Sequence, residues 1–312
     1  MNFLKLFFQC SLRLCVFAVI IIVFLSGTNP VIAQTNAATG LPFLKLGVGA
    51  RSIAMGEAYT AIAEDASSMF YNPGALAFSP SDEILLMHKQ WIVQTTSEYL
   101  GSVIHSGDII FGIGLNSTGV SGIEIREKPG PAEGTFSQQN AAINGTVSYR
   151  IGSTFGIGAS AKFLYEKIYV DEASGTAFDL GAFYRMNSFL DLGASLSNLG
   201  SMNALRYEAT SLPTMLRLGG AFHDNLSDEI ATVTDADVVK VFNDNGTRIH
   251  LGGEASYDNT FALRAGYQFG YDEKGFSAGF GVHYAPIQFD YAYVPFKNNI
   301  GTTHTFSLIF RF

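Results

Sequence analysis

The strongest constraint on the fold is a pattern of alternation that recurs along most of the chain. From about residue 82 onward, segments of roughly 8–13 residues place apolar and polar side chains at alternating positions, and turn-forming residues separate the segments. In one of them Phe261, Leu263 and Ala265 alternate with Arg264. Because successive side chains of a β-strand point to opposite faces, each segment is predicted to be a strand with one apolar and one polar face.

Fourteen such strands are predicted. Their expected ranges are 83–93, 97–106, 108–117, 138–150, 153–166, 176–187, 189–197, 213–223, 229–241, 247–256, 260–269, 275–285, 287–294 and 303–312. The segment 229–241 fits least well, because Asp235 and Asp237 stand among its apolar positions. The even number suits an antiparallel barrel of the bacterial outer membrane, which would make the chain an all-β membrane protein.

The connections between the strands favour the same architecture. When the strands are paired from the first, all long connections fall within pairs, and they include 118–137, 167–175 and 198–212. The connections between pairs are short. Outer-membrane barrels have long extracellular loops and tight periplasmic turns, so both chain termini are expected in the periplasm of a Gram-negative cell.

The last strand carries an aromatic stripe that runs to the final residue. Phe306, Leu308, Phe310 and Phe312 occupy every second position. This strand resembles the closing strand of bacterial outer-membrane barrels, whose C-terminal Phe is read by the assembly machinery. The resemblance implies that Phe310 and Phe312 form an assembly signal, and that membrane lipid and the assembly machinery are partners.

The N-terminus has the composition of a secretory signal peptide. Two basic residues precede or border an apolar run of about twelve residues, and small residues up to Ala33 predict a signal over 1–33. Cys10 and Cys15 both lie in this segment, so the mature chain has no cysteine. Stability is therefore expected from a closed, hydrogen-bonded barrel rather than from disulfides.

Charge and motifs exclude several classes of function. The signal carries two basic and no acidic residues, which leaves 17 Lys and Arg against 27 Asp and Glu, a net charge near −10 that argues against a nucleic-acid partner. No run of 18 apolar residues follows the signal, which argues against a helical membrane protein. No nucleophile elbow, Walker loop or metal-ligand spacing occurs. We expect no enzymatic activity, metal or cofactor.

Residues 34–81 do not alternate and are predicted to form a separate hatch in front of the barrel, 82–312. An Ala-rich helix is expected over 52–63 with Ser52 as its N-cap, followed by a turn at Asn72, Pro73 and Gly74. A segment of 48 residues with few large apolar side chains folds poorly alone. The hatch is therefore expected to pack inside the barrel as a plug.

The hatch sequence GARSIAMGEAYTAIAEDASSMFYNPGALA resembles a signature of the fatty-acid-transporter-like (FadL-like) barrels, and most closely their PorV/PorQ-type branch, which is associated with type IX secretion. The hatch residues that carry the resemblance include Gly49, Ala50, Arg51, Met55, Gly56, Asp65, Asn72, Pro73 and Gly74. Gly74 and the residue after it depart from the usual Ala-Gly order. The resemblance implies a fourteen-stranded barrel with a hatch in its lumen.

Three functions remain open at this point. A PorV/PorQ-type barrel would act without catalysis in or beside type IX protein secretion, and its long loops would contact secretion-system proteins or exported cargo. A FadL-like barrel would transport hydrophobic small molecules through its lumen. A structural surface barrel without transport is the third possibility.

Ionisable side chains on the polar faces of the strands are predicted to form a salt-bridge network in the lumen. They are Lys162, Glu166, Asp179, Arg185, Arg217, His250, Glu254, Arg264, His283 and Asp290. The hatch residue Arg51 is expected to pair with one of the carboxylates, because a buried charge needs a partner. Its candidate partners are Asp179, Glu254 and Asp290; an anionic head group of a ligand is the alternative. Asn72 and Pro73 are expected to shape the hatch turn, with ligand gating as the alternative.

Overall fold

The structure is a computed structural model that describes residues 39–312 apart from 127, 243 and 245. The predicted signal peptide, with Cys10 and Cys15, lies outside the described residues, as does the predicted start of the hatch at residue 34. Among the described residues, no helix has the length and apolar character needed to cross a membrane.

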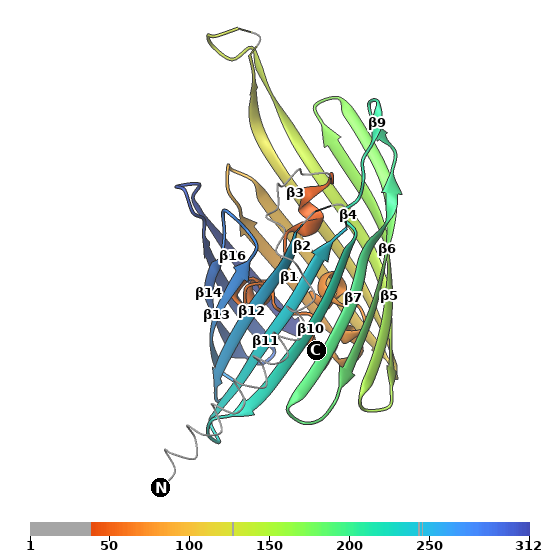
Figure 1. Cartoon of the computed structure of the whole chain (residues 1–312), viewed down its shortest axis with the longest axis vertical. Coiled ribbons are helices and arrows are strands. Elements are labelled where there is room, and N and C mark those ends of the chain that lie inside the picture. The colour runs from red at the N-terminus through yellow and green to blue at the C-terminus, as the bar shows by residue number, and fades with distance from the viewer. Residues whose placement is uncertain (1–38, 127, 243, 245) are drawn as a thin grey trace. The chain divides into compact units, whose positions relative to one another are not determined.

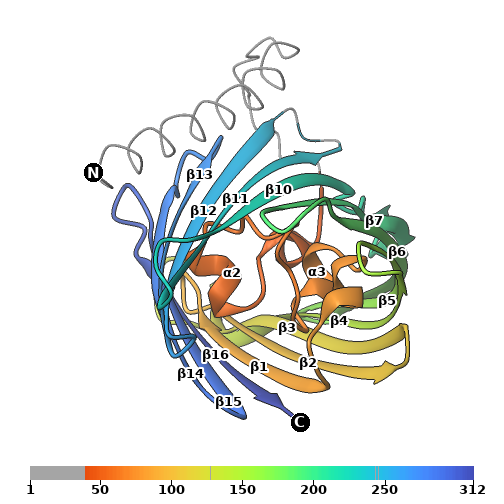
Figure 2. The same cartoon turned by 90° about the horizontal axis from the view of Figure 1, so that it is seen from below.

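Fourteen antiparallel strands close into a barrel, as predicted (Figures 1 and 2). Their bounds are β1 Glu83–Gln90, β2 Thr96–Ser106, β3 Ile109–Ile125, β4 Gly134–Ile151, β5 Phe155–Ile168, β6 Asp171–Arg185, β7 Leu190–Met202, β10 Met215–Asn225, β11 Ile230–Val241, β12 Thr247–Tyr257, β13 Phe261–Phe269, β14 Phe276–Tyr284, β15 Ile287–Pro295 and β16 Thr302–Arg311. The barrel closes because β1 pairs with β16, from Glu83 opposite Arg311 to Gln90 opposite His304.

The wall carries apolar side chains on its outside and polar side chains on its inside, opposite to the arrangement in a water-soluble protein. Large apolar side chains point outward, and Leu263 of β13 is 71% exposed whereas its neighbour Arg264 is 6% exposed. Phe310 of the closing strand β16 and Phe312, just after it, are also exposed. An outer apolar surface with a polar lumen is the arrangement of a barrel surrounded by lipid.

Three predicted long loops are shorter than expected. The segment 118–137 is mostly strand, because β3 and β4 continue as a two-stranded hairpin that rises beyond its neighbours (Figure 1). The segment 167–175 contains the ends of β5 and β6, and 198–212 contains the end of β7 and a hairpin of β8 (Ala204–Leu205) and β9 (Glu208–Ala209). Outside the lipid band a strand needs no apolar face, so alternation does not reveal it.

The two ends of the barrel differ. The backbone amide of Phe312 donates to the carbonyl of Asp82 (3.0 Å) at the end with short turns. The backbone amide of Gly40 donates to the carbonyl of Ser211 (3.0 Å) in the long connection after β7, at the opposite end. The described part of the hatch therefore runs from the long-connection end of the lumen to the short-turn end, where β1 begins.

The hatch is built from short helices inside the ring of strands (Figure 2). They are η1 Pro42–Lys45, α2 Ala50–Ala54, α3 Ser68–Tyr71 and η2 Ala75–Phe78. The predicted helix over 52–63 was wrong in both bounds: α2 starts after Gly49, and it ends where Gly56 and Glu57 take positive φ angles of 67° and 59°. Ser52 is no N-cap; its hydroxyl donates to the carbonyls of Val48 and Gly49.

Candidate functional site

The hatch backbone lies directly against the wall where the wall has glycine. A Cβ added to Gly266 of β13 would lie 2.1 Å from the amide nitrogen of Gly56, and one added to Gly158 of β5 would lie 2.2 Å from the carbonyl oxygen of Pro73. Both distances are far below ordinary van der Waals contact. These wall glycines allow a backbone-to-backbone approach that any other residue would prevent.

Further glycines repeat this contact around the barrel. A Cβ on Gly193 of β7 would lie 2.3 Å from the carbonyl oxygen of Thr60, and one on Gly252 of β12 would lie 2.4 Å from that of Met55. Gly253, the next residue on the same strand, has no atom within 4 Å of such a Cβ. We call Gly158, Gly193, Gly252 and Gly266 the seat glycines.

Side chains of the wall satisfy the backbone of the hatch. Asp237 of β11 accepts hydrogen bonds from the amides of Tyr59 (3.0 Å) and Thr60 (3.1 Å) and from the Thr60 hydroxyl (2.6 Å). Buried backbone groups of an irregular segment need such partners. This explains why Asp237 stands among the apolar positions of 229–241: its side chain faces the hatch rather than lipid.

The predicted turn at Asn72 is also bound to the wall. The Asn72 amide group donates to the carbonyls of Thr60 (2.9 Å) and Ala182 (3.0 Å), and its oxygen accepts from the amide of Gly74 (3.0 Å). Asp65 acts within the hatch, where it accepts from the Tyr59 hydroxyl (2.9 Å). These contacts are structural, and they join successive hatch turns to one another and to β6.

Arg51 lies on the side of the hatch that faces β12 and pairs with Glu254. Its Nε donates to Glu254 Oε2 (2.9 Å) and its Nη2 donates to Oε1 (2.8 Å), a bidentate geometry. Glu254 also accepts from Arg264 Nε of β13, and Arg264 Nη1 donates to Asp290 Oδ1 of β15 (2.7 Å). The carboxylate of Glu254 therefore lies between two guanidinium groups.

The same network continues across the seam between the first and last strands. Gln288 donates to Asp290 (2.8 Å) and accepts from Arg311 of β16 (2.8 Å). Arg311 Nε donates to Glu83 of β1 (3.2 Å), and Glu83 accepts from the backbone amide of Ala66 (2.6 Å). These ion pairs and hydrogen bonds form one continuous chain that begins and ends on the hatch. We call it the ion-pair chain; it runs from Arg51 through Glu254, Arg264, Asp290, Gln288, Arg311 and Glu83 to the backbone amide of Ala66.

The ion-pair chain crosses β14 at Gly281. β14 lies between β13 and β15, and a Cβ on Gly281 would lie 2.5 Å from Asp290 Oδ1 and 2.7 Å from both terminal nitrogens of Arg264. The absence of a side chain at this position leaves room for the Arg264–Asp290 contact. Spacing along the sequence does not indicate such a crossing.

The other ionisable residues predicted for the lumen form separate contacts. Lys162 Nζ pairs with Asp179 (2.6 Å) and donates to Asn198 Oδ1 (2.9 Å). Arg185 pairs with Glu64 of the hatch and approaches Asp191 (3.6 Å). The structure therefore does not join all of the predicted residues into one network.

Four more predicted residues occupy different surroundings. The guanidinium of buried Arg217 lies over the Tyr71 ring, 5.3 Å from its centroid. His250 contacts the Glu57 carbonyl (3.2 Å) and the Tyr271 hydroxyl (3.2 Å). Among the described residues Glu166 is buried and has no side-chain hydrogen-bond or ion-pair partner, and His283 is half-buried beside Arg264 at the short-turn end.

One charged group of the hatch was not predicted. Glu57, which is 7% exposed, pairs with Lys274 in the connection between β13 and β14 (3.3 Å). Burial alone would raise the pKa of the Glu57 carboxyl, but the charges of Lys274 and other nearby cations hold this pKa at about 2. Its position just after α2, in a left-handed turn, gave no sequence signal for this role.

Hollows of different size border the hatch. Two hollows that border it, one near Lys89 and Trp91 and one near Leu44 and Tyr99, have volumes of about 30 and 20 Å³. Each has room for one or two water molecules. A polar hollow of about 210 Å³ lies at the short-turn end beside Arg51 and Glu254. No group of three metal-ligating side chains occurs within the described residues.

A family model described as "Uncharacterised protein family (UPF0164)" matches residues 31–199. No curated protein sequence matches the chain. Solved structures with the same fold include two toluene transporters and a FadL homologue. The Pseudomonas putida toluene transporter TodX is 14% identical, with a TM-score of 0.61 over 85% of this chain and 99% of its own.

The other two are similar at lower scores. The Ralstonia pickettii toluene transporter TbuX is 12% identical, with a TM-score of 0.58 over 85% of this chain and 98% of its own. A Pseudomonas aeruginosa FadL homologue is 12% identical, with a TM-score of 0.55 over the same shares. At these identities the likeness shows a common FadL-like fold.

Proposed function

Since the chain belongs to the family described as UPF0164 and has a FadL-like fold, we propose that it is an outer-membrane channel for hydrophobic small molecules. The observation that carries this proposal is a fourteen-stranded barrel whose lumen is filled by a hatch, in the fold that two toluene transporters share. The proposed role involves no enzymatic step.

The proposed orientation follows from the asymmetry of the barrel. The apolar outer surface contacts lipid, the projecting β3–β4 hairpin faces the outside of the cell, and Phe312 lies on the periplasmic side (Figure 1). In this orientation the outer-membrane lipid and the barrel assembly machinery are partners of the chain.

We propose that passage requires the hatch to move. Two hollows beside it hold one or two water molecules each, and the larger hollow beside Arg51 is lined largely by polar and charged side chains. The contacts that resist such movement are the ion-pair chain from Arg51 and the Asp237 hydrogen bonds. We propose that an apolar solute displaces part of the hatch rather than passing through a permanent pore.

Uptake by intact cells tests this function. Cells that carry the barrel in the outer membrane are compared with cells that lack it, with labelled toluene and a fluorescent long-chain fatty acid as probes. We expect faster uptake of at least one probe, and no increase in the uptake of a small sugar, because the hatch closes the lumen. Equal uptake of both apolar probes by the two kinds of cell would contradict the proposal.

A role in type IX protein secretion is a second proposal, and it rests on the resemblance of the hatch sequence. One structural observation favours it: the β3–β4 hairpin extends beyond the neighbouring strands and offers a surface to another protein (Figure 1). A pull-down from outer membranes, with the hairpin intact and shortened, tests this role. Recovery of no secretion component or exported cargo with the intact hairpin would rule it out.

A further inference from the structure

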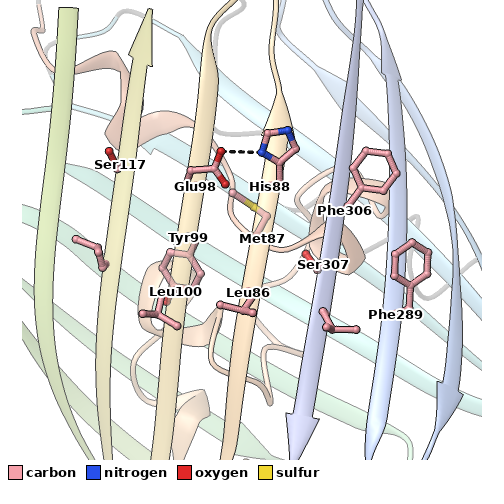
Figure 3. A pocket seen from close by; sticks show the side chains of 12 residues that line it. Leu86, Met87, His88, Glu98, Tyr99, Leu100, Ser117, Phe289, Phe306 and Ser307 are labelled. Atoms are coloured by element: carbon pink, nitrogen blue, oxygen red, sulfur yellow. Dashed lines mark hydrogen bonds and ion pairs between the residues drawn. The ribbon is translucent and has the colours of Figure 1, made fainter.

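A groove of about 430 Å³ lies on the outer wall, across the seam where β1 meets β16 (Figure 3). Its sides are outward-facing side chains of β1, β2, β3, β15 and β16. Met87, Tyr99 and Ser307 border it through their backbone, because their buried side chains point into the lumen and contact the hatch. The volume lies within the range of small-molecule sites, roughly 300–1,000 Å³.

Strand register sorts the sides of the groove into two neighbouring rows. The row nearer the short-turn end is wholly apolar. In order across the wall it consists of Leu115, Leu100, Leu86, Leu308 and Phe289. This row is continuous over five strands, so it offers an unbroken apolar surface.

The row nearer the long-connection end is polar at the groove. It runs from Ser117 through Glu98 and His88 to Phe306. His88 Nδ1 and Glu98 Oε1 are 2.7 Å apart, and the two side chains are 45% and 54% exposed (Figure 3). Among the described residues, neither the second Glu98 oxygen nor His88 Nε2 has a further hydrogen-bond partner.

Polar groups at this height mark the edge of the lipid band. On the neighbouring strands the Tyr291 hydroxyl and His304 Nδ1 are hydrogen-bonded (2.8 Å), in the position of an aromatic girdle at a membrane interface. The groove therefore has a polar end at the interface and an apolar end within the hydrocarbon. This is the polarity of a lipid molecule.

We propose that the groove binds a zwitterionic glycerophospholipid of the surrounding membrane, with an ethanolamine head group. One acyl chain packs against the apolar row, with Leu100 and Leu86 at the centre of the contact. The ammonium group contacts the oxygen of Glu98 that His88 leaves free. A half-exposed carboxylate at the polar end of an apolar groove matches a lipid whose head group carries an ammonium. This site is separate from the transport proposed above and does not depend on it.

Native mass spectrometry of the full-length mature barrel tests the site. The barrel is purified in detergent and titrated with phosphatidylethanolamine or with phosphatidylglycerol, which lacks the ammonium group. We expect one phosphatidylethanolamine to remain bound under activation that removes other lipids, and at least tenfold less bound phosphatidylglycerol. Leu100→Trp, which fills the groove, should lower phosphatidylethanolamine retention at least tenfold.

Leu263→Trp is the matched control, because Leu263 faces outward on β13, away from the groove. It should retain the lipid as the unaltered barrel does. If Leu100→Trp does not give a heat-modifiable barrel, Glu98→Gln replaces it and should abolish the preference for phosphatidylethanolamine. Equal retention of the two lipids by the unaltered barrel, or a lipid-free dimer, would overturn the proposal.

Discussion

At the scale of single residues, glycine positions decide how the hatch and the wall fit together. Gly252 and Gly253 are neighbours on β12 with opposite surroundings: a Cβ at the first meets Met55, and a Cβ at the second meets nothing within 4 Å. Alanine variants at these two positions therefore separate two effects on stability: the clash of a Cβ with the hatch backbone, and the replacement of glycine within a strand.

Gly252→Ala is expected to destabilise the folded barrel by about 1–3 kcal/mol, the usual result of overpacking. The added methyl group must displace the carbonyl of Met55, which lies 2.4 Å away. The measurement is the urea concentration at which the fast-migrating band of unboiled protein disappears. Gly253→Ala should leave that midpoint within experimental error, and equal shifts in the two variants would contradict the seat model.

Glu254→Gln should be more harmful, because it removes the negative charge between Arg51 and Arg264. Breaking a buried pair and leaving charges unpaired costs about 3–5 kcal/mol. The same urea titration measures the loss. Glu172→Gln removes an exposed partner of Lys167 and should not change the urea midpoint. If Glu172→Gln shifted the midpoint as much as Glu254→Gln does, the ion-pair chain would have no special role in stability.

Because of the Glu57 carboxyl, we expect the stability of the folded barrel to depend on pH. Its pKa is about 2 in the folded barrel against an ordinary value of 4.5, so it stabilises the fold fully above pH 4.5. That stabilisation, about 3 kcal/mol from the 1.36 kcal/mol per pKa unit, is lost as the pH falls from 4.5 to 2. Urea midpoints measured across this range should fall less steeply for Glu57→Gln than for the unaltered chain; parallel slopes would refute the assignment.

Residue patterns predicted part of this site. Alternation places Glu254, Arg264 and Asp290 on the lumenal faces of their strands, because lipid excludes charge from the other face. The choice of partners was not predictable, since it depends on register across four strands and on the missing side chain at Gly281.

At the scale of elements, strands within the lipid band were easier to predict than strands outside it. β13 and β15 alternate clearly, and their predicted bounds differ from the structure by one residue at one end. The outer half of β3, 118–125, and the first four residues of β4, 134–137, were predicted as a loop. α2 was also mispredicted, because its length is set by contacts with the wall rather than by helix propensity.

The β3–β4 hairpin should be dispensable for barrel stability. Beyond the pair Thr96–Gly119, β3 has no neighbour except β4, so the outer hairpin adds few contacts to the wall. Replacing residues 122–134 with a short turn should keep heat-modifiable migration and leave the urea midpoint nearly unchanged. Loss of the fast-migrating band would show that the hairpin has a structural role.

At the scale of the whole molecule, stability is divided between a wall that pairs with itself and a hatch that depends on the wall. Every wall strand has two hydrogen-bonded neighbours, which leaves no edge exposed. The hatch helices span four or five residues each and are too short to be stable alone. Their conformation is imposed by the seat glycines and by the ion-pair chain.

The contact between Glu83 and Arg311 has a consequence for the order of assembly. Arg311 belongs to β16, the last wall strand in the sequence, and the hatch precedes every wall strand. Because Arg311 donates to the Glu83 carboxylate that accepts from the Ala66 amide, this contact of the hatch involves the last wall strand to be synthesised. The hatch must therefore remain without the complete contact until β16 pairs with β1.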